Sequence, residues 1–340
     1  MDILRNILFA PLSWLYATAV WFRNILYSEH LLPSFHVSIP TICVGNLAVG
    51  GTGKTPHVEY LIRLLSPHYK IAVLSRGYGR KTHGFLLADE QSTALTIGDE
   101  PMQIHTKFPD VPVAVCANRL IGIHQLQQRY PDLQAVLLDD AYQYRKLKCG
   151  MYILLTAADR LYTHDRFLPW GRLRDTREQS QRAHIIIVTK CPTDMQPIDR
   201  RIIQNTLHLS AFQNLYFSTV HYTSLKQIVD TDRSALIVTG IAHPEPLIEY
   251  IRSMVPQVRV LSYADHHWFN NKDIETLEAA AAETEQIFTT EKDYTRLATL
   301  PLSDALKNKL KAIPIEIILQ DKQDFDRQII NYIKENNRNK

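Results

Sequence analysis

Residues 48–55, with the sequence Ala-Val-Gly-Gly-Thr-Gly-Lys-Thr, lie between an apolar run and a segment with helical periodicity. The apolar run covers residues 38–44 and has the composition of a β-strand, whereas residues 57–65 repeat their apolar side chains as a helix does. Flexible glycines let backbone N–H groups curl around a polyphosphate, and the N-terminus of a helix attracts negative charge. The three segments together predict a phosphate-binding loop in a chain that binds ATP or GTP.

Six residues of this loop are the predicted nucleotide contacts: Gly50, Gly51, Thr52, Gly53, Lys54 and Thr55. The Lys54 ammonium can reach the β- and γ-phosphates, and the Thr55 hydroxyl can bind Mg²⁺. The general pattern has glycine where this chain has Ala48, but two of the loop glycines supply flexibility nearby. We therefore expect a nucleotide and Mg²⁺ as cofactors, with Lys54 as a catalytic residue.

The rest of the composition is that of a soluble globular enzyme. With 340 residues the chain is long enough for two domains of ordinary size. A formal net charge of +3 without any Lys/Arg run gives no reason to expect a nucleic-acid partner. The four cysteines are widely spaced and form no C-x-x-C pair, which argues for a reducing compartment and against a zinc site or a disulfide framework.

The N-terminal segment, residues 1–28, is the compositional exception. No charged residue occurs between Arg5 and Arg23, and leucines and aromatic residues recur there at helical spacing. The stretch is shorter than the about 20 apolar residues of a spanning helix, and a site that needs cytoplasmic ATP argues against export. We expect an amphipathic helix that lies in the membrane interface; the alternative is a helix packed on the protein's own core.

After the loop, strand-like runs alternate with helical patterns, which predicts an α/β fold with a mostly parallel, doubly wound sheet. The first series of strand-like runs comprises residues 71–75, 113–116, 135–139, 152–156 and 185–189. A second series, which we interpret as a smaller α/β domain, comprises residues 235–239, 258–261, 286–289 and 315–319. The predicted organisation is therefore a helix over residues 1–28, a P-loop domain over residues 29–220 and a second domain over residues 221–340.

Two carboxylates, Asp139 and Asp140, end the apolar run 135–139. In open α/β sheets, ligands collect at the carboxyl ends of the strands. Both residues are therefore candidates for holding Mg²⁺ on the nucleotide. The alternative is that aspartate serves only the turn that follows the strand.

The sequence Gly98-Asp99-Glu100-Pro101 precedes a helical pattern. The default role of Asp99 in this position is to cap the helix, with Glu100 in its first turn. The functional alternative is a carboxylate that accepts a proton from an attacking hydroxyl group. The two roles are compatible with each other.

Basic side chains follow the run 71–75, where Arg76 and Arg80 reach the same end of the sheet as the phosphate loop. They are candidates for binding an anionic substrate, and a solvated basic turn is an equal alternative. Asp265 and His266 follow a strand-like run of the second series. A carboxylate beside an imidazole is suited to proton transfer, although such pairs are more often structural.

In their order and spacing, these motifs resemble those of the tetraacyldisaccharide 4'-kinase family, the lipid A 4'-kinases of Gram-negative bacteria. The motifs are Gly50-Gly51-Thr52-Gly53-Lys54-Thr55-Pro56, Ser75-Arg76-Gly77-Tyr78-Gly79, Gly98-Asp99-Glu100-Pro101, Asp139-Asp140-Ala141-Tyr142-Gln143-Tyr144-Arg145 and Asp265-His266. The family usually has D-D-G-F-Q-H-R in the fourth motif, so this chain departs from it at three positions, including Tyr144 in place of histidine.

The resemblance implies a kinase that transfers phosphate from ATP to the 4'-hydroxyl of an acylated glucosamine disaccharide 1-phosphate, a lipid A precursor. It also implies two α/β domains joined by a short β hinge, and an N-terminal helix that seats the enzyme on the cytoplasmic face of the inner membrane. Its implied roles are ATP-Mg²⁺ binding by Lys54 and Thr55, and metal binding by Asp139, Asp140 and Glu100. Asp99, supported by His266, would activate the hydroxyl group, and Arg76, Arg80 and Arg145 would bind the substrate.

A different class of function also fits the phosphate loop and the apolar N-terminus. A membrane-associated P-loop NTPase could hydrolyse its nucleotide to switch the binding of a partner, without any lipid acceptor. The absence of an evident nucleophile triad fits phosphoryl transfer, which depends on positioning and charge neutralisation.

Overall fold

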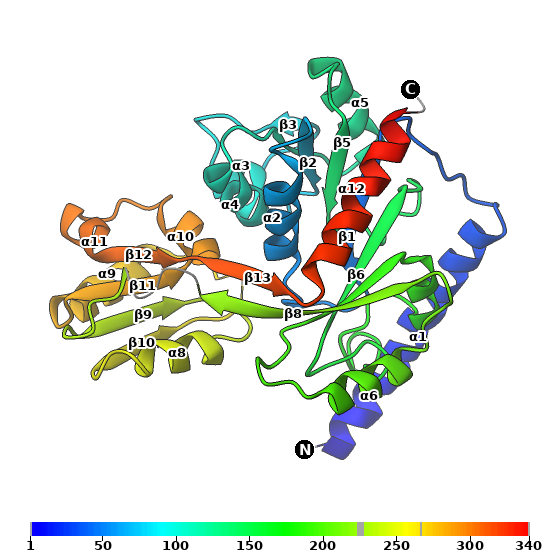
Figure 1. The fold of residues 1–340 in the computed structure, drawn as a ribbon. Helices are drawn as coiled ribbons and strands as arrows, with labels where there is room; N and C mark the ends of the chain where they lie inside the picture. Colours follow the sequence, from blue (N-terminus) through cyan, green and yellow to red (C-terminus); the bar gives the residue numbers. More distant parts are fainter. Residues whose placement is uncertain (1, 223–227, 266, 339–340) are drawn as a thin grey trace.

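The computed structural model describes residues 2–222, 228–265 and 267–338, which form two β-sheets flanked by helices (Figure 1). Among these residues, nine strands form the larger sheet in the order β13-β8-β7-β6-β1-β5-β2-β4-β3. Their bounds are β1 Thr41–Asn46, β2 Ile71–Ser75, β3 Leu86–Leu87, β4 Val113–Val115, β5 Ala135–Asp139, β6 Met151–Ala157, β7 Ile185–Thr189, β8 Asn214–Tyr222 and β13 Ile315–Leu319. Seven of the strands run parallel, and the edge strands β3 and β13 run antiparallel to their neighbours.

Helices cover both faces of this sheet, because its strands carry apolar side chains on both sides. In β1, Ile42 and Val44 belong to one buried core, whereas Cys43 belongs to the core on the opposite face. The first face is covered by helices α2 Lys54–Leu65, α4 Asp99–Lys107 and α12 Lys322–Arg338, and the second by α5 Arg119–Arg129 and α6 Pro197–Leu207. The short helices α3 Ala94–Ile97 and η1 Arg177–Arg182 lie in connections. This arrangement confirms the predicted doubly wound α/β fold.

The smaller sheet has the strand order β10-β9-β11-β12 and is parallel throughout its described part. Its strands are β9 Ala235–Thr239, β10 Val258–Ser262, β11 Gln286–Thr290 and β12 Leu310–Ile313. They alternate with helices α8 Glu245–Arg252, α9 Asn271–Ala282, α10 Glu291–Leu297 and α11 Asp304–Lys309. The sheet has a core on each of its faces, so it buries apolar surface independently of the larger sheet.

The chain enters the smaller sheet after β8 and leaves it through β12 and β13, which run in the same direction in Figure 1. Strand β13 pairs with β8 in antiparallel fashion, from Ile315 opposite Tyr222 to Leu319 opposite Ser218. Helix α12 then packs on the larger sheet. Residues 315–319 were expected in the second α/β series, but their pairing with β8 places them in the larger sheet. The apolar side chains of α12 belong to a core of the same sheet. The domain boundaries at residues 28 and 220 stay predictions.

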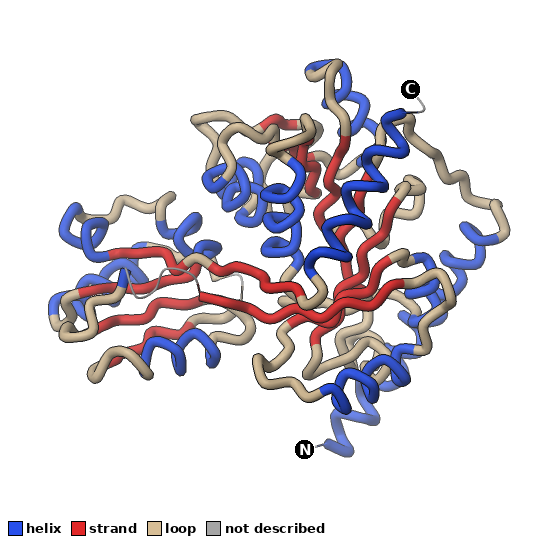
Figure 2. The backbone as a smooth tube through the Cα atoms, in the orientation of Figure 1, coloured by secondary structure: helices blue, strands red, loops and turns tan. Residues whose placement is uncertain are grey.

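Helix α1, Asp2–Ser28, runs along the outer side of the larger sheet (Figures 1 and 2). One side of it is bound to the loop after β6: the Ser13 hydroxyl donates to the Phe167 carbonyl at 2.8 Å, and the Asn24 amide donates to Asp175 at 2.7 Å. Apolar side chains on its other side are exposed, namely Leu12, Trp14, Leu15, Trp21 and Phe22. No helix in the described part of the chain is both long and apolar enough to cross a membrane.

Candidate active site

The phosphate loop connects the central strand β1 to helix α2 at the carboxyl edge of the larger sheet. Gly50 and Gly53 have φ angles of 107° and 83°, which side chains other than that of glycine rarely adopt. Lys54 begins α2, and no described side chain caps this helix, so its first N–H groups point into the loop. The Asn46 amide donates to the Thr52 hydroxyl at 2.8 Å and holds the loop over the end of β1. The local geometry is therefore that of an anion-binding helix start.

Strand β5 pairs with β1 and brings its terminal carboxylates beside the phosphate loop, with Val44 opposite Asp139. Asp140 turns out of the strand with a φ of 49°, and its Oδ2 lies 3.9 Å from Lys54 Nζ. Burial would raise the pKa of Asp140, but the cations of Lys54 and Arg174 outweigh this effect and lower the pKa to about 2. Asp140 is thus the ionised partner of the loop lysine.

Asp139 is fully buried, and neither of its carboxylate oxygens has a hydrogen-bond partner among the described residues. Burial and the nearby Glu100 and Asp140 carboxylates raise the pKa of Asp139 to about 8, whereas Lys54 opposes this shift. A buried carboxyl without a partner is costly unless it is neutralised or binds a cation. The arrangement therefore fits a residue that completes its coordination only with a ligand.

A loop that the sequence analysis did not single out, residues 158–176 after β6, runs along the phosphate loop. The Val49 N–H donates to the Arg172 carbonyl at 2.7 Å, and the Arg174 N–H donates to the Leu47 carbonyl at 2.9 Å. The Arg174 guanidinium contacts both carboxylate oxygens of Asp140, with a distance of 3.0 Å to Oδ2. The loop contains four arginines, and the sequence does not tell which of them reaches Asp140, so only the pairing of the two loops reveals this contact.

Asp99 begins helix α4 and is buried beside helix α10 of the smaller sheet. Its Oδ1 accepts the Glu100 N–H at 2.9 Å, and its Oδ2 lies 3.1 Å from the Nε of Arg296. Lys292 Nζ lies 3.7 Å from the same Oδ2 and 3.0 Å from Glu100. The N-cap of α4 is Gly98 and no described side chain caps this helix, so the capping role expected of Asp99 is wrong. Cations from helix α10 hold its carboxylate instead.

The turn after β2 packs directly on the start of α4. Gly77 and Gly98 have φ angles of 68° and 97°, and a methyl group at Gly77 would lie 2.7 Å from the Ile97 carbonyl. Substitution at either glycine would thus be strained and would separate the turn from Asp99. This close backbone approach explains why glycine occurs in the motifs Ser75-Arg76-Gly77-Tyr78-Gly79 and Gly98-Asp99-Glu100-Pro101.

The three predicted substrate arginines are in different surroundings. Arg76 is exposed beside the site. Arg80 donates to the Gly84 and Val115 carbonyls, at 2.6 and 3.4 Å. Arg145 donates to the Asn24 carbonyl at 3.0 Å and lies over the Tyr27 ring, so it holds the end of α1. Arg80 and Arg145 therefore already have structural partners.

The predicted catalytic His266 lies outside the described residues. Its neighbour His267 has its Nε2 2.8 Å from Asp273 and stacks on the Tyr263 ring, so it serves the packing of the smaller sheet. Tyr144, where the family motif has histidine, lies over Arg119 and donates its hydroxyl proton to Asn118 at 2.9 Å. That departure is accommodated by contacts at the start of α5.

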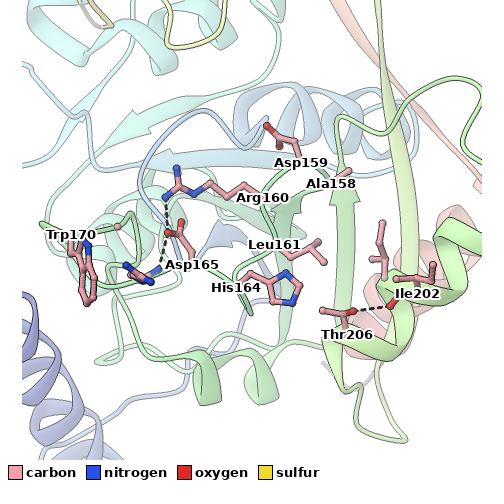
Figure 3. A pocket seen from close by; sticks show the side chains of 12 residues that line it. Ala158, Asp159, Arg160, Leu161, His164, Asp165, Trp170, Ile202 and Thr206 are labelled. Carbon is pink, nitrogen blue, oxygen red and sulfur yellow. Dashed lines mark hydrogen bonds and ion pairs between the residues drawn. The ribbon is translucent and has the colours of Figure 1, made fainter. Parts of the chain in front are cut away.

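A cavity of about 680 Å³ lies beyond the carboxyl end of β6, between the loop 158–171 and helix α6 (Figure 3). In this view, Asp165 faces Arg160, whose Nη2 lies 2.8 Å from the carboxylate, and Ile202 closes the opposite side. The lining combines acidic, basic, aromatic and apolar side chains. None of the residues proposed from the sequence lines it.

A glycine-rich loop between β1 and α2, with carboxylates from β5 and α4 at the same sheet edge, defines an α/β P-loop phosphotransferase. Comparison with known proteins identifies the family within this class. The model of the tetraacyldisaccharide-1-P 4'-kinase family matches residues 5–334, and the chain belongs to that family. The expected family, α/β fold class and enzyme class are thereby confirmed, whereas the expected membrane association of the N-terminal helix stays a prediction.

Relatives match over nearly their whole length. The tetraacyldisaccharide 4'-kinase of Bacteroides thetaiotaomicron is 47% identical over 355 residues, which cover 97% of this chain and 93% of that protein. The corresponding protein of Flavobacterium johnsoniae is 45% identical over 345 residues and 99% of both chains. Among solved structures, LpxK of Aquifex aeolicus in complex with ATP has a TM-score of 0.74 at 25% identity, over 97% of this chain and 99% of that one.

The protein is accordingly a kinase that phosphorylates the 4'-hydroxyl of tetraacyldisaccharide 1-phosphate in lipid A biosynthesis. The nucleotide-dependent switch that the sequence analysis kept as an alternative is not favoured.

Proposed function

We propose that the site around the phosphate loop transfers the γ-phosphoryl group of ATP with Lys54, Asp139, Asp140 and Asp99 as its central residues. The observation that carries this assignment is the buried carboxylate of Asp139, which lacks a described partner beside the Lys54–Asp140 pair. The ATP complex of the related Aquifex aeolicus protein supports ATP as the nucleotide. Gly50, Gly51, Thr52 and Gly53 supply the loop whose N–H groups face the phosphates.

The residues present fit a magnesium ion. Asp139, Asp140, Thr55 and Glu100 are oxygen ligands of the kind that Mg²⁺ prefers, and they gather at one sheet edge. The described residues contain no cluster of three or more side chains that would hold a metal unaided. That is expected of a magnesium ion that takes most of its ligands from water and nucleotide phosphates. When bound, the ion neutralises charge on the phosphate oxygens.

The chain's own residues provide position and charge. Lys54 and the N–H groups of α2 hold the phosphates, while Arg174 keeps Asp140 ionised and oriented. Asp99 accepts the proton of the 4'-hydroxyl as the new O–P bond forms and the bond to the β-phosphate bridging oxygen breaks, which releases ADP. His266 is kept as the predicted support of Asp99.

For the acylated substrate, we propose that α1 rests on the membrane surface and brings the site to its lipid. The exposed Trp14, Leu15 and Phe22 are suited to the acyl boundary, while the opposite side of the helix is bound to the protein. We place the enzyme at the cytoplasmic face of the inner membrane, where ATP is available. Of the predicted substrate arginines, Arg76 is exposed toward solvent and is the first candidate for the anionic sugar.

The transfer of labelled γ-phosphate from ATP-Mg²⁺ to tetraacyldisaccharide 1-phosphate in detergent micelles tests the site assignment. We expect labelled lipid with the unmodified protein and a loss of at least 10²-fold in rate with Asp99→Ala and with Lys54→Ala. Full activity of either variant would remove that residue from the mechanism. Label released only to water by the unmodified protein would contradict the transfer itself.

A further inference from the structure

Helix α10 of the smaller sheet lies against helix α4 of the larger sheet with opposite charges facing each other. Near the C-terminus of α4, Lys107 Nζ lies 2.7 Å from Glu291, the first residue of α10. Near the N-terminus of α4, Glu100 lies 3.0 Å from Lys292. Helix α10 of the smaller sheet therefore contacts the helix that carries Asp99 through these two ion pairs.

Within this interface, Arg296 is a fully buried cation, with only 1% of its surface exposed. Its Nε lies 3.1 Å from Asp99 Oδ2, and its Nη2 contacts the same oxygen. Its Nη1 lies 3.0 Å from Asp293, which also accepts the Gly240 N–H at 2.9 Å. A buried guanidinium is costly unless its partners are well placed, so this geometry is specific.

The second carboxylate oxygen of Asp99 is also constrained. Oδ1 accepts the backbone N–H of Glu100, so contacts on both oxygens fix the plane of the carboxylate. An arginine fork can orient a carboxylate in this way, whereas a lysine supplies a point charge without a preferred plane. The contact at Oδ2 comes from helix α10 of the smaller sheet, although Asp99 belongs to helix α4 of the larger sheet.

We propose that Arg296 is a positioning residue that orients the Asp99 carboxylate for proton transfer from the acceptor hydroxyl. This inference rests on the proposed role of Asp99 and assigns the smaller sheet a direct part in preparing the site. The contacts of Arg296 join Asp99 to Asp293 and to the Gly240 and His267 carbonyls, so we expect its loss to act on the chemical step more than on nucleotide binding.

The test compares Arg296→Ala and Arg296→Lys with the unmodified enzyme in the lipid phosphorylation assay. We expect Arg296→Ala to lower kcat roughly 10²-fold, because a misplaced catalytic group loses a factor of that order. The KM for ATP should stay within about threefold. Added guanidinium ion should restore part of the lost kcat in Arg296→Ala. The kcat of Arg296→Lys should lie between that of Arg296→Ala and that of the unmodified enzyme. The control is Arg259→Ala, which removes an exposed ion pair with Glu283 in the same sheet.

Each of the following results would overturn the inference. If Arg296→Ala keeps its kcat while Asp99→Asn loses activity, Asp99 acts without Arg296 and the proposed function stands. If Arg296→Ala has both a lower kcat and a higher KM for ATP, and added guanidinium ion restores no activity, the arginine has only a structural role. If Arg296→Ala does not fold, Arg296→Lys takes its place. A kcat of Arg296→Lys equal to that of the unmodified enzyme would then overturn the inference, because the planar guanidinium would not be needed. If Asp99→Asn is fully active, the proposed role of Asp99 fails first and the inference falls with it.

Discussion

Lys54 and Asp140 face each other at the carboxyl edge of the larger sheet, with 3.9 Å between Nζ and Oδ2. Arg174 contacts the same aspartate from the loop after β6. Two cations therefore share one carboxylate beside the place where a polyphosphate would bind. Neighbouring cations of this kind are suited to phosphate oxygens, since both can turn toward a stronger anion.

Replacement of Lys54 by alanine should lower kcat roughly 10²- to 10³-fold, because the charge that acts on the transferred phosphate is removed. The measurement is the rate of lipid phosphorylation at saturating ATP. Lys70→Ala is the matched control, since Lys70 pairs with Asp132 at the opposite edge of the sheet and is largely exposed. An equal loss in both variants would show that general charge, not this position, matters.

Replacement of Asp139 by asparagine should separate function from stability. Above its ordinary pKa the Asp139 carboxyl must take up a proton to be buried, whereas an amide is neutral in both the folded and the unfolded chain, so at neutral pH the metal-free variant should be more stable by about 1–3 kcal/mol. It should also lose the rise in melting temperature that Mg²⁺ with nucleotide produces in the unmodified protein, and most of its activity. Thermal unfolding with and without Mg²⁺ measures both effects. A variant that Mg²⁺ stabilises as well as the unmodified protein would exclude Asp139 as a ligand.

His57 should make stability depend on pH. Its Nδ1 donates to the Gly53 carbonyl at 2.7 Å, so its Nε2 accepts the Ser218 hydroxyl proton at 3.1 Å, which fixes a neutral tautomer. Burial lowers the pKa of His57 from 6.5 to about 4, despite the opposing effect of the hydrogen bond to Gly53. The unfolded chain therefore takes up a proton that the folded chain refuses between these values. Stability is fully present above pH 6.5 and falls as the pH drops toward 4, by at most roughly 3 kcal/mol.

Denaturant unfolding at pH 7 and pH 5 checks this dependence. His57→Gln keeps an amide that can donate to Gly53 and accept from Ser218, but it does not titrate. Its free energy of unfolding should change less between the two pH values than that of the unmodified protein. Equal pH slopes for the two proteins would assign the dependence to other groups.

Gly45 is where β1 approaches the turn after β5 most closely. A methyl group at this position would lie 2.6 Å from Tyr142 Cβ, so Gly45→Ala must displace the turn that follows the two aspartates. We expect a loss of about 1–3 kcal/mol in stability, together with reduced activity. Gly84→Ala is the comparison, because a methyl group there meets no described atom within 4 Å and only its φ of 70° is unfavourable. A larger loss at Gly84 would contradict this explanation.

The exposed side of α1 should determine binding to lipid vesicles. Trp14→Asp and Leu15→Asp each replace an apolar contact with a charge, and each should weaken binding at least about tenfold. Sedimentation with vesicles of phosphatidylethanolamine and phosphatidylglycerol measures it. Ile121→Asp, on the exposed side of α5, is the matched control. Unchanged binding of both α1 variants would place the membrane contact elsewhere.

Local sequence predicted the elements around the phosphate loop well, since each depends on short-range pattern. The runs 71–75, 135–139 and 185–189 are strands with those bounds, because apolar runs of only five residues between turn residues are too short for a buried helix. The proximity of Lys54 to Asp139 and Asp140 then follows from the rule that ligands bind at the carboxyl ends of the strands of a parallel sheet.

Long-range pairing was beyond reach of the same reasoning. The run 315–319 is a strand as expected, but its partner β8 lies far away in sequence, so periodicity could not assign it to a sheet. Arg174 and Arg296 resemble surface arginines in any sequence window, and only the fold brings them to Asp140 and Asp99. Charge was visible in the sequence, whereas its burial was not.

The antiparallel pairing of β8 with β13 places the two ends of the intervening segment side by side. The smaller sheet is thus an insertion within a single continuous fold, attached through neighbouring strands. A gene could gain or lose such a segment at one point, because the flanking strands need only a tight turn to remain joined. An ancestral nucleotide-binding unit could in this way acquire the arginine that orients its acceptor site in one recombination step.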